Sequence, residues 1–190
     1  MDALSEQQIG QLIGQRDYKG ALEAIAAAHG KALGRFCAGL LGSISDGEEA
    51  LQDAMVQVLH SMPTYRGDGV RAWTFGIARN VCAGELKKRT RRRSLWGRMF
   101  GGDEAVQTLD ASDARLSVDK GLARLSPPLR EALLLRYQQG MDATEVADVL
   151  GISHAAARKR ISLALAGLRT TLDVPVTHAA PVEGLRGERS

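Results

Sequence analysis

A chain of 190 residues, 44% of them hydrophobic, is long enough for one domain or two small ones with packed cores. Aromatic residues make up only 4%, whereas long stretches are rich in Ala, Leu, Arg, Glu and Gln, which favour helices. The sequence has no convincing run of alternating β-branched residues, so it predicts an all-α protein and argues against a sheet. The net charge of +3 does not indicate a nucleic-acid partner, and only its local distribution can do so.

The sequence indicates neither a metal site nor a membrane segment. Cys37 and Cys82 lie in apolar helical contexts and the four histidines are scattered, so we expect buried thiols and no metal or cofactor. The amino terminus, MDALSEQQ, is polar and acidic, unlike a signal peptide. No apolar run approaches the ~18 residues of a membrane helix, and we expect a cytoplasmic protein without direct membrane insertion.

The first 62 residues are predicted to be helical. Three short helices and a turn are expected at Ser5 to Arg16, Asp17 to His29, Lys31 to Leu41 and Gly42 to Ser45. Asp46 to Met62 then carries apolar residues at helical spacing, and Pro63 ends this helix. Its other face is acidic, which fits either a solvated surface or a docking surface for a basic partner.

A loop with two glycines, Thr64 to Val70, precedes a long helix from Arg71 to about Arg93. Such a loop can be a simple turn, but its polar side chains and an amide on the following helix also suit the capture of an unstacked base. Trp73 and Phe75 lie two residues apart and cannot share one helix face, so we expect Trp73 in the core and leave Phe75 open.

The end of this long helix is strongly basic. Six of the seven residues from Lys87 to Arg93 are Lys or Arg, which suits the C-terminal end of a helix. Their mutual repulsion indicates an anionic partner, although a helix end exposed to water is the simplest alternative. A membrane surface is a weaker alternative because the apolar face of a membrane-lying helix is missing locally. Duplex phosphates fit better, and binding would then depend strongly on salt.

The chain is predicted to form two small helical domains, 1–95 and 118–173, joined by a flexible linker at 96–117. A tail at 174–190, with prolines, glycines and mixed charge, is expected to be disordered. In the second domain, Ser126-Pro127-Pro128 predicts the start of a helix and Gly140 its end. The apolar side of that helix is expected to comprise Leu129, Leu133, Leu134 and Tyr137.

Asp142 to Arg169 is predicted to form two helices joined by a tight turn. Asp142 and Glu145 have the spacing of a capping box, and Ser153 is placed to cap the second helix. A helix-turn-helix that presents cations from its second helix is built to enter a DNA major groove, although a small bundle with incidental arginines is the alternative. The residues expected to contact DNA are Ser153, His154, Ala155, Arg158, Lys159 and Arg160.

Three segments carry a resemblance: DGEEALQDAMVQVLHSM (46–62), YRGDGVRAWTFGIARNVCAGELKKRTRRR (65–93) and LSPPLREALLLRYQQGMDATEVADVLGISHAAARKRI (125–161). Together, in this order, they resemble the extracytoplasmic-function (ECF) class of bacterial sigma factor. The first is similar to the core-polymerase-binding helix of that family's second region, the next to its promoter-melting segment, and the last to its fourth region. The resemblance covers most of residues 20 to 170.

The resemblance implies a transcription initiation factor that performs no covalent chemistry and has no small-molecule substrate. Its partners would be core RNA polymerase (beta-prime clamp helices and beta flap), promoter DNA and an anti-sigma factor. Contact with core polymerase would fall to Asp46, Glu49, Gln52 and Asp53. Capture and opening of the minus-ten element would fall to Tyr65, Arg66, Asp68, Arg79, Asn80, Lys87, Lys88, Arg91 and Arg92. The second domain would read the minus-thirty-five element.

The chain departs from the family at two places in its last helix. Ala155-Ala156-Ala157 stands where Gly-Thr-Val is usual, and Leu163 and Leu165 stand where arginines are frequent. Weaker contact with phosphate is expected there.

Two other classes of protein compete with this interpretation. A stand-alone helix-turn-helix regulator would bind duplex DNA as a dimer, but it would leave the acidic helix and the melting segment unexplained. An enzyme with an appended DNA-binding domain would need a catalytic cluster in residues 1–95, and the sequence offers none.

Overall fold

The computed structural model describes residues 4–67, 69–100 and 113–172, with side chains for all of these except 93, 96–100, 113–117 and 172. All regular structure in these ranges is helical, which confirms the predicted all-α class. The elements are α1 (Glu6–Gly14), α2 (Tyr18–Leu41), α3 (Ile44–Ser61), η1 (Met62–Thr64), α4 (Val70–Phe100), α5 (Asp113–Arg124), α6 (Pro127–Leu133), η2 (Leu134–Gln138), α7 (Ala143–Leu150) and α8 (His154–Leu172). The predicted tail lies outside the described residues, as does the part of the predicted linker at 101–112.

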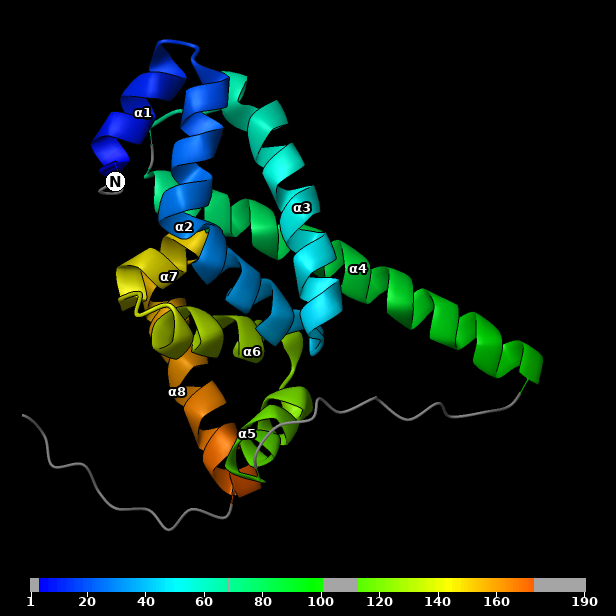
Figure 1. Cartoon of the computed structure of the whole chain (residues 1–190). Coiled ribbons are helices and arrows are strands. Elements are labelled where there is room, and N and C mark those ends of the chain that lie inside the picture. The colour runs from blue at the N-terminus through cyan, green and yellow to red at the C-terminus, as the bar shows by residue number, and fades with distance from the viewer. Residues whose placement is uncertain (1–3, 68, 101–112, 173–190) are drawn as a thin grey trace, which may run out of the picture.

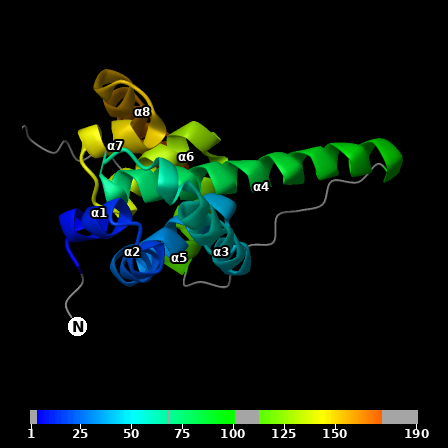
Figure 2. The same ribbon diagram turned by 90° about the horizontal axis from the view of Figure 1, so that it is seen from above.

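Helix α4 is the central element of the molecule. Its amino-terminal half lies between α1–α3 on one side and α6–α8 on the other, while its carboxy-terminal end projects beyond the rest of the structure (Figures 1 and 2). The helix runs to Phe100, further than the end near Arg93 that the sequence predicted. Helix α5 also begins earlier than expected, at Asp113, inside the segment predicted to be irregular.

The second and third predicted helices are in fact one continuous helix, α2. The predicted break at Gly30 was wrong. Buried residues continue at helical spacing on both sides of Gly30, from Ile25 to Leu33, Phe36 and Leu40. A glycine inside a helix costs about 1 kcal/mol relative to alanine. Burial of several large side chains on both sides of Gly30 outweighs that cost.

The core of the first domain places the two aromatic residues of α4 differently from the prediction. Phe75 is completely buried and meets Phe36 of α2 edge-on, with ring centroids 5.4 Å apart. Trp73 is only half-buried and packs on the other side of α4, in a smaller cluster with α1. The two residues therefore occupy different faces, as predicted, but Phe75 and not Trp73 is the fully buried ring.

Both cysteines are fully buried thiols, as predicted. A hydrogen bond to Cys37, together with burial, raises the pKa of the Cys82 thiol and keeps it protonated. This pair joins α2 to α4 inside the core.

The second domain contains a turn of π-helix that changes which residues are buried. Helix α6 opens into η2, where the backbone N–H of Gln139 donates to the carbonyl of Leu134. A π-turn holds more residues than an α-turn, so it rotates the side chains that follow it. Leu133 and Leu134 are buried as predicted, but Tyr137 is 58% exposed and its assignment to the apolar side was wrong.

The two domains share one hydrophobic core. A single cluster of buried side chains includes Phe36, Leu40 and Phe75 from the first domain and Leu135 and Val146 from the second. A Cβ atom on Gly76 of α4 would lie 3.7 Å from the carbonyl oxygen of Val149 on α7, so the two helices approach closely there. In this structure the second domain therefore packs directly against α2 and α4.

Candidate polymerase and nucleic-acid interfaces

Helix α3 presents a polar face with an apolar centre to solvent. Glu49, Gln52 and Asp53 are exposed and share one side of the helix with Val56, which is 51% exposed. Leu59, one of the apolar residues that recur at helical spacing in Asp46 to Met62, is 36% exposed at the edge of this face. Polar residues around a small apolar centre are typical of protein interfaces.

Asp46, the fourth residue predicted on this face, has an internal partner. Its carboxylate pairs with the Arg89 guanidinium at 2.6 Å, which joins the start of α3 to α4. Arg89 also donates to the carbonyl of Leu41 at 3.2 Å, at the end of α2. One cation of the basic segment therefore fastens the three helices together, and the sequence contained no local signal for this role.

One side of α4 forms a continuous stripe, which we define as Trp73, Asn80, Lys87 and Arg91. Their spacing of seven, seven and four residues places them within a narrow sector of the helix. Tyr65 packs against Trp73, with ring centroids 4.8 Å apart, so an aromatic pair stands at one end of the stripe. Asn80 is exposed beyond it, and the exposed cations follow. Aromatic rings, an amide and cations in this order match the needs of a single nucleic-acid strand for stacking, base contact and charge neutralisation.

The remaining residues predicted for the minus-ten element are dispersed around this stripe. Lys88 and Arg92 are exposed on a neighbouring side of α4, where Lys88 pairs with Glu85 at 2.5 Å. Arg66 is exposed in the loop after η1, and Asp68 lies outside the described residues. Of the predicted residues, Asn80, Lys87 and Arg91 thus share one side of α4, and Tyr65 packs on Trp73 at the start of that side.

Arg79 pairs with the second domain, and its Nη1 atom also donates to Oδ1 of Asn80 in the stripe at 3.4 Å. Its Nε atom lies 2.9 Å from Oε2 of Glu131 on α6, and the Glu131 side chain is only 7% exposed. Arg71, the second residue of the same helix, pairs with Glu145 of α7 at 3.0 Å and also donates to the carbonyl of Gln139. The sequence gave no reason to expect either ion pair, because the partners are 52 and 74 residues apart.

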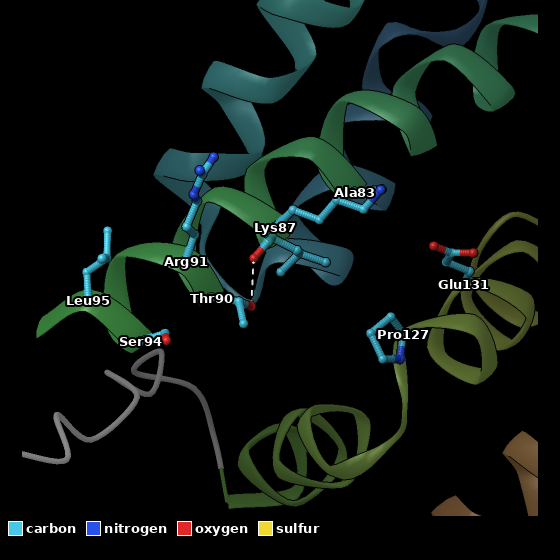
Figure 3. Close-up of a pocket in the computed structure, with 9 residues that line it drawn as sticks. Ala83, Lys87, Thr90, Arg91, Ser94, Leu95, Pro127 and Glu131 are labelled. Carbon is cyan, nitrogen blue, oxygen red and sulfur yellow. Dashed lines mark hydrogen bonds between the residues drawn. The ribbon is translucent and has the colours of Figure 1, made fainter. Parts of the chain in front are cut away.

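A groove runs between the carboxy-terminal half of α4 and α6. It has a volume of about 660 Å³, and Figure 3 shows Lys87, Thr90 and Arg91 on one wall and Pro127 and Glu131 on the other. The α4 stripe therefore borders the second domain along this groove.

Helix α8 presents the residues predicted to read duplex DNA. Ser153, His154, Ala155, Arg158 and Lys159 are exposed at its amino-terminal end, whereas Arg160 is half-buried on the opposite side. Arg158 and, on its flank, Lys159 form a cationic edge beside His154. The other side of α8 packs through Ala157, which is fully buried in the shared core, and through Ala164, which is fully buried against Leu125 and Leu133.

Local contacts fix the turn that precedes α8, as the sequence predicted. The Asp142 carboxylate accepts from the backbone N–H groups of Thr144 and Glu145, and the Glu145 side chain accepts from the N–H of Asp142. Gly151 ends α7 with φ = 62°, a conformation that favours glycine, and Ser153 Oγ accepts from Ala156 N–H at 3.2 Å. Ser126 occupies the predicted capping position of α6 but makes no side-chain capping hydrogen bond.

Asp142 gives the helix-turn-helix an acid-sensitive contact. Hydrogen bonds from the backbone of Glu145 and Thr144 hold the pKa of its carboxyl below the usual value. A lowered pKa in the folded state means that the stabilisation is complete above the unfolded pKa and is lost as the pH falls through the folded pKa. We expect native protein to unfold at higher urea than Asp142→Asn at neutral pH, with a smaller difference at about pH 3. Paired urea titrations at the two pH values test this, and a difference independent of pH would contradict it.

Among the residues whose side chains are described, no three His, Cys, Asp or Glu side chains gather into a metal site. No helix within the described ranges combines the length and the hydrophobicity needed to cross a membrane.

Known proteins share both halves of this architecture. Residues 25–92 match the family model for Sigma-70 region 2, and residues 115–168 match the model for Sigma-70, region 4. The RNA polymerase sigma factor CnrH of Cupriavidus metallidurans is 31% identical over 166 residues, which cover 80% of this chain and 87% of CnrH. The ECF RNA polymerase sigma factor SigL of Mycobacterium tuberculosis is 27% identical over 157 residues, covering 80% of this chain and 88% of SigL.

Two solved structures agree with the fold over nearly the whole chain. CnrH, solved in complex with the cytosolic domain of CnrY, superimposes with a TM-score of 0.68 at 26% identity, covering 90% of this chain and 98% of that one. RpoE of Bartonella quintana, solved with the anti-sigma factor NepR, gives a TM-score of 0.66 at 25% identity, with coverages of 84% and 98%.

Helical domains that match regions 2 and 4 of sigma-70 define a promoter-specificity subunit of RNA polymerase. The chain belongs to the ECF type of the sigma-70 family. It directs promoter recognition and is not an enzyme, as the sequence analysis predicted.

Proposed function

We propose that the chain docks on core RNA polymerase through α3, captures the melted minus-ten strand along the α4 stripe and reads the minus-thirty-five element with α8. The polymerase surfaces would be the beta-prime clamp helices for the first domain, predicted at 1–95, and the beta flap for the second, at 118–173. The protein would act in the cytoplasm, where the polymerase and the promoters are.

The order of side chains along α4 is the observation that carries this proposal. Tyr65 and Trp73 provide stacking surface, Asn80 provides an amide that can pair with a base edge, and Lys87 and Arg91 provide charge for phosphates. These residue types on one side of α4, together with the exposed polar face of α3, support the proposal. A regulator of duplex DNA alone has no use for such an arrangement.

Reconstitution with core polymerase tests the proposal. Core enzyme with the purified chain should produce specific transcripts from a promoter library, and core enzyme alone should not. A stand-alone regulator would instead bind duplex DNA by itself and yield no polymerase-dependent start, and that result would overturn the proposal.

Regulation by an anti-sigma factor is a second part of the proposal. The support comes from RpoE of Bartonella quintana, which resembles 84% of this chain and was solved with the anti-sigma factor NepR. Such a partner would cover the polymerase- and DNA-binding faces of this chain, and it should therefore inhibit the reconstituted transcription when added before core enzyme.

Replacement of Asn80 separates strand opening from duplex binding. Asn80→Ala should reduce promoter opening by about tenfold or more, because the proposed partner base is accessible only in melted DNA. Permanganate reactivity of the minus-ten region measures opening, and gel shift of the holoenzyme on duplex promoter measures binding. Gln57→Ala, which removes an exposed amide from α3, is the matched control. An equal loss of opening and binding in Asn80→Ala would count against the assigned role.

A further inference from the structure

Helix α1 precedes the residues that match the region 2 model. It spans Glu6–Gly14, whereas the match begins at residue 25. The amino-terminal end of α4 lies beside it (Figures 1 and 2). A capping box begins the helix: Ser5 Oγ accepts from the backbone N–H of Gln8 at 3.3 Å, and Gln8 Oε1 accepts from the N–H of Ser5 at 2.8 Å. The chain therefore contains a well-formed helix to which the proposed function assigns no role.

The buried side of α1 shares a core with the residues on both sides of the loop before α4. Ile9 is 0% and Ile13 is 5% exposed, and both lie in one cluster with Met62 of η1 and Val70, the first residue of α4. Met62 and Val70 are each only 1% exposed. The carbonyl of Met62 accepts from the backbone N–H of Tyr65 at 3.1 Å. Packing on α1 therefore fixes the chain immediately before and after the loop.

The aromatic pair of the α4 stripe rests on the same cluster. Tyr65 and Trp73 are half-buried and pack against it, with their ring centroids 4.8 Å apart. The backbone N–H of Trp73 donates to the carbonyl of Gly69 at 3.0 Å. The Glu6 carboxylate of α1 lies 4.0 Å from where a Cβ atom on Gly69 would be. Because packed interiors transmit displacements, a shift of α1 would shift the two rings.

We propose that α1 is a positioning element for capture of the minus-ten strand, because it holds the Tyr65 and Trp73 rings where a base can stack on them. The proposed docking face of α3 lies apart from this contact. Val58 of α3 belongs to the α1 cluster, whereas Val56 on the docking face is 51% exposed on another side of that helix. The inference rests on the proposed function, since it takes the two rings as the stacking surface. A change in α1 should therefore weaken strand capture and leave polymerase binding intact.

Ile9→Ala tests this role because it removes most of a fully buried side chain from α1. The probe is a fluorescent single-stranded minus-ten oligonucleotide from a promoter that the native protein uses. Holoenzyme with Ile9→Ala should bind it about fivefold or more weakly, the effect of losing one stacked base. The affinity of the variant for labelled core polymerase should equal that of native protein. Ile9→Val, a conservative change, should keep most of the oligonucleotide affinity. Ile13→Ala repeats the test one turn further along α1 if Ile9→Ala does not fold.

Two control variants separate positioning from stability. Leu33→Ala empties an equally buried position in the large shared cluster, which includes neither Tyr65 nor Trp73. It should lower the urea midpoint of unfolding about as much as Ile9→Ala does and leave oligonucleotide binding at the native level. Gly10→Ala changes α1 where a Cβ atom meets none of the described atoms within 4 Å, so it should behave like native protein in both binding assays.

Fluorescence of Trp73 reports the position of the rings directly. The chain has two tryptophans, so Trp96→Phe leaves Trp73 as the only one. In this background, Ile9→Ala should make Trp73 more accessible to quenching by acrylamide, because its ring loses the support of α1. Leu33→Ala should leave the quenching unchanged.

Three results would overturn the inference. Native-like oligonucleotide binding by folded Ile9→Ala and Ile13→Ala would show that the rings do not depend on α1. An equal loss of binding in Leu33→Ala would reduce the effect to global stability. A parallel loss of core binding in Ile9→Ala would make α1 a support of the whole first domain. Failure of the proposed function would appear separately, as an absence of specific transcripts from native protein with core polymerase.

Discussion

Replacing Gly47 by alanine should destabilise the first domain by roughly 1–3 kcal/mol, the usual cost of forcing an extra group into a packed core. A Cβ atom at Gly47 would lie 2.6 Å from both the N and Cα atoms of Ala38, so α3 would have to move away from α2. Backbone atoms cannot rotate away as a side chain can. The free energy of unfolding from urea titration measures the loss, and weaker binding to core polymerase should accompany it because α3 carries the proposed docking face.

Gly30→Ala is the matched control for Gly47→Ala. Gly30 lies inside α2, and a Cβ atom there would meet none of the described atoms within 4 Å. Alanine should therefore stabilise the helix by up to about 1 kcal/mol. Opposite signs for the two substitutions would support the packing described here. Equal effects of the two substitutions would mean that α3 does not approach α2 as closely at Gly47 and Ala38 as described.

Replacing Arg158 and Lys159 together by alanine should reduce transcription from promoters that need the minus-thirty-five element by about thirtyfold or more. Each good contact between such a side chain and a base is worth roughly 1–3 kcal/mol. Both side chains are exposed at the amino-terminal end of α8, where a recognition helix meets base edges. Run-off transcription from promoters with and without the upstream element measures the effect.

Arg169→Ala provides the control for this pair. Arg169 is also an exposed cation on α8, but it lies several turns further along the helix. It should change transcription little, so a similar loss in Arg169→Ala would indicate a general charge effect. Unchanged use of the upstream element in the double variant would show that another side of α8 enters the groove.

Features set by neighbouring residues could be predicted from the sequence. The capping box of Asp142 and Glu145 and the cap at Ser153 depend on contacts within three residues, and the structure has them as expected. Helix class and the exposure of His154 and Arg158 likewise follow from local patterns.

Features set by distant residues could not be predicted in the same way. Whether Trp73 or Phe75 is buried depends on where α2 lies. Phe75 is the buried residue because it packs against Phe36 of α2. Tyr137 is exposed because a π-turn shifts the register, and no residue pattern in the sequence indicated that turn. The engagement of Arg79 by Glu131 and of Asp46 by Arg89 likewise requires the tertiary fold.

The projecting end of α4 has a kinetic consequence. Lys88, Arg91 and Arg92 are exposed on the carboxy-terminal half of α4, and the end of that helix extends beyond the rest of the structure (Figure 2). At physiological ionic strength, charges more than about 8 Å from DNA are largely screened. Cations on a projecting helix come within this distance of DNA before the other cations of the protein do. Exposed cations near the end of α4 therefore steer the approaching holoenzyme towards DNA before any base is contacted. Association rates, far more than dissociation rates, should then fall as salt is added.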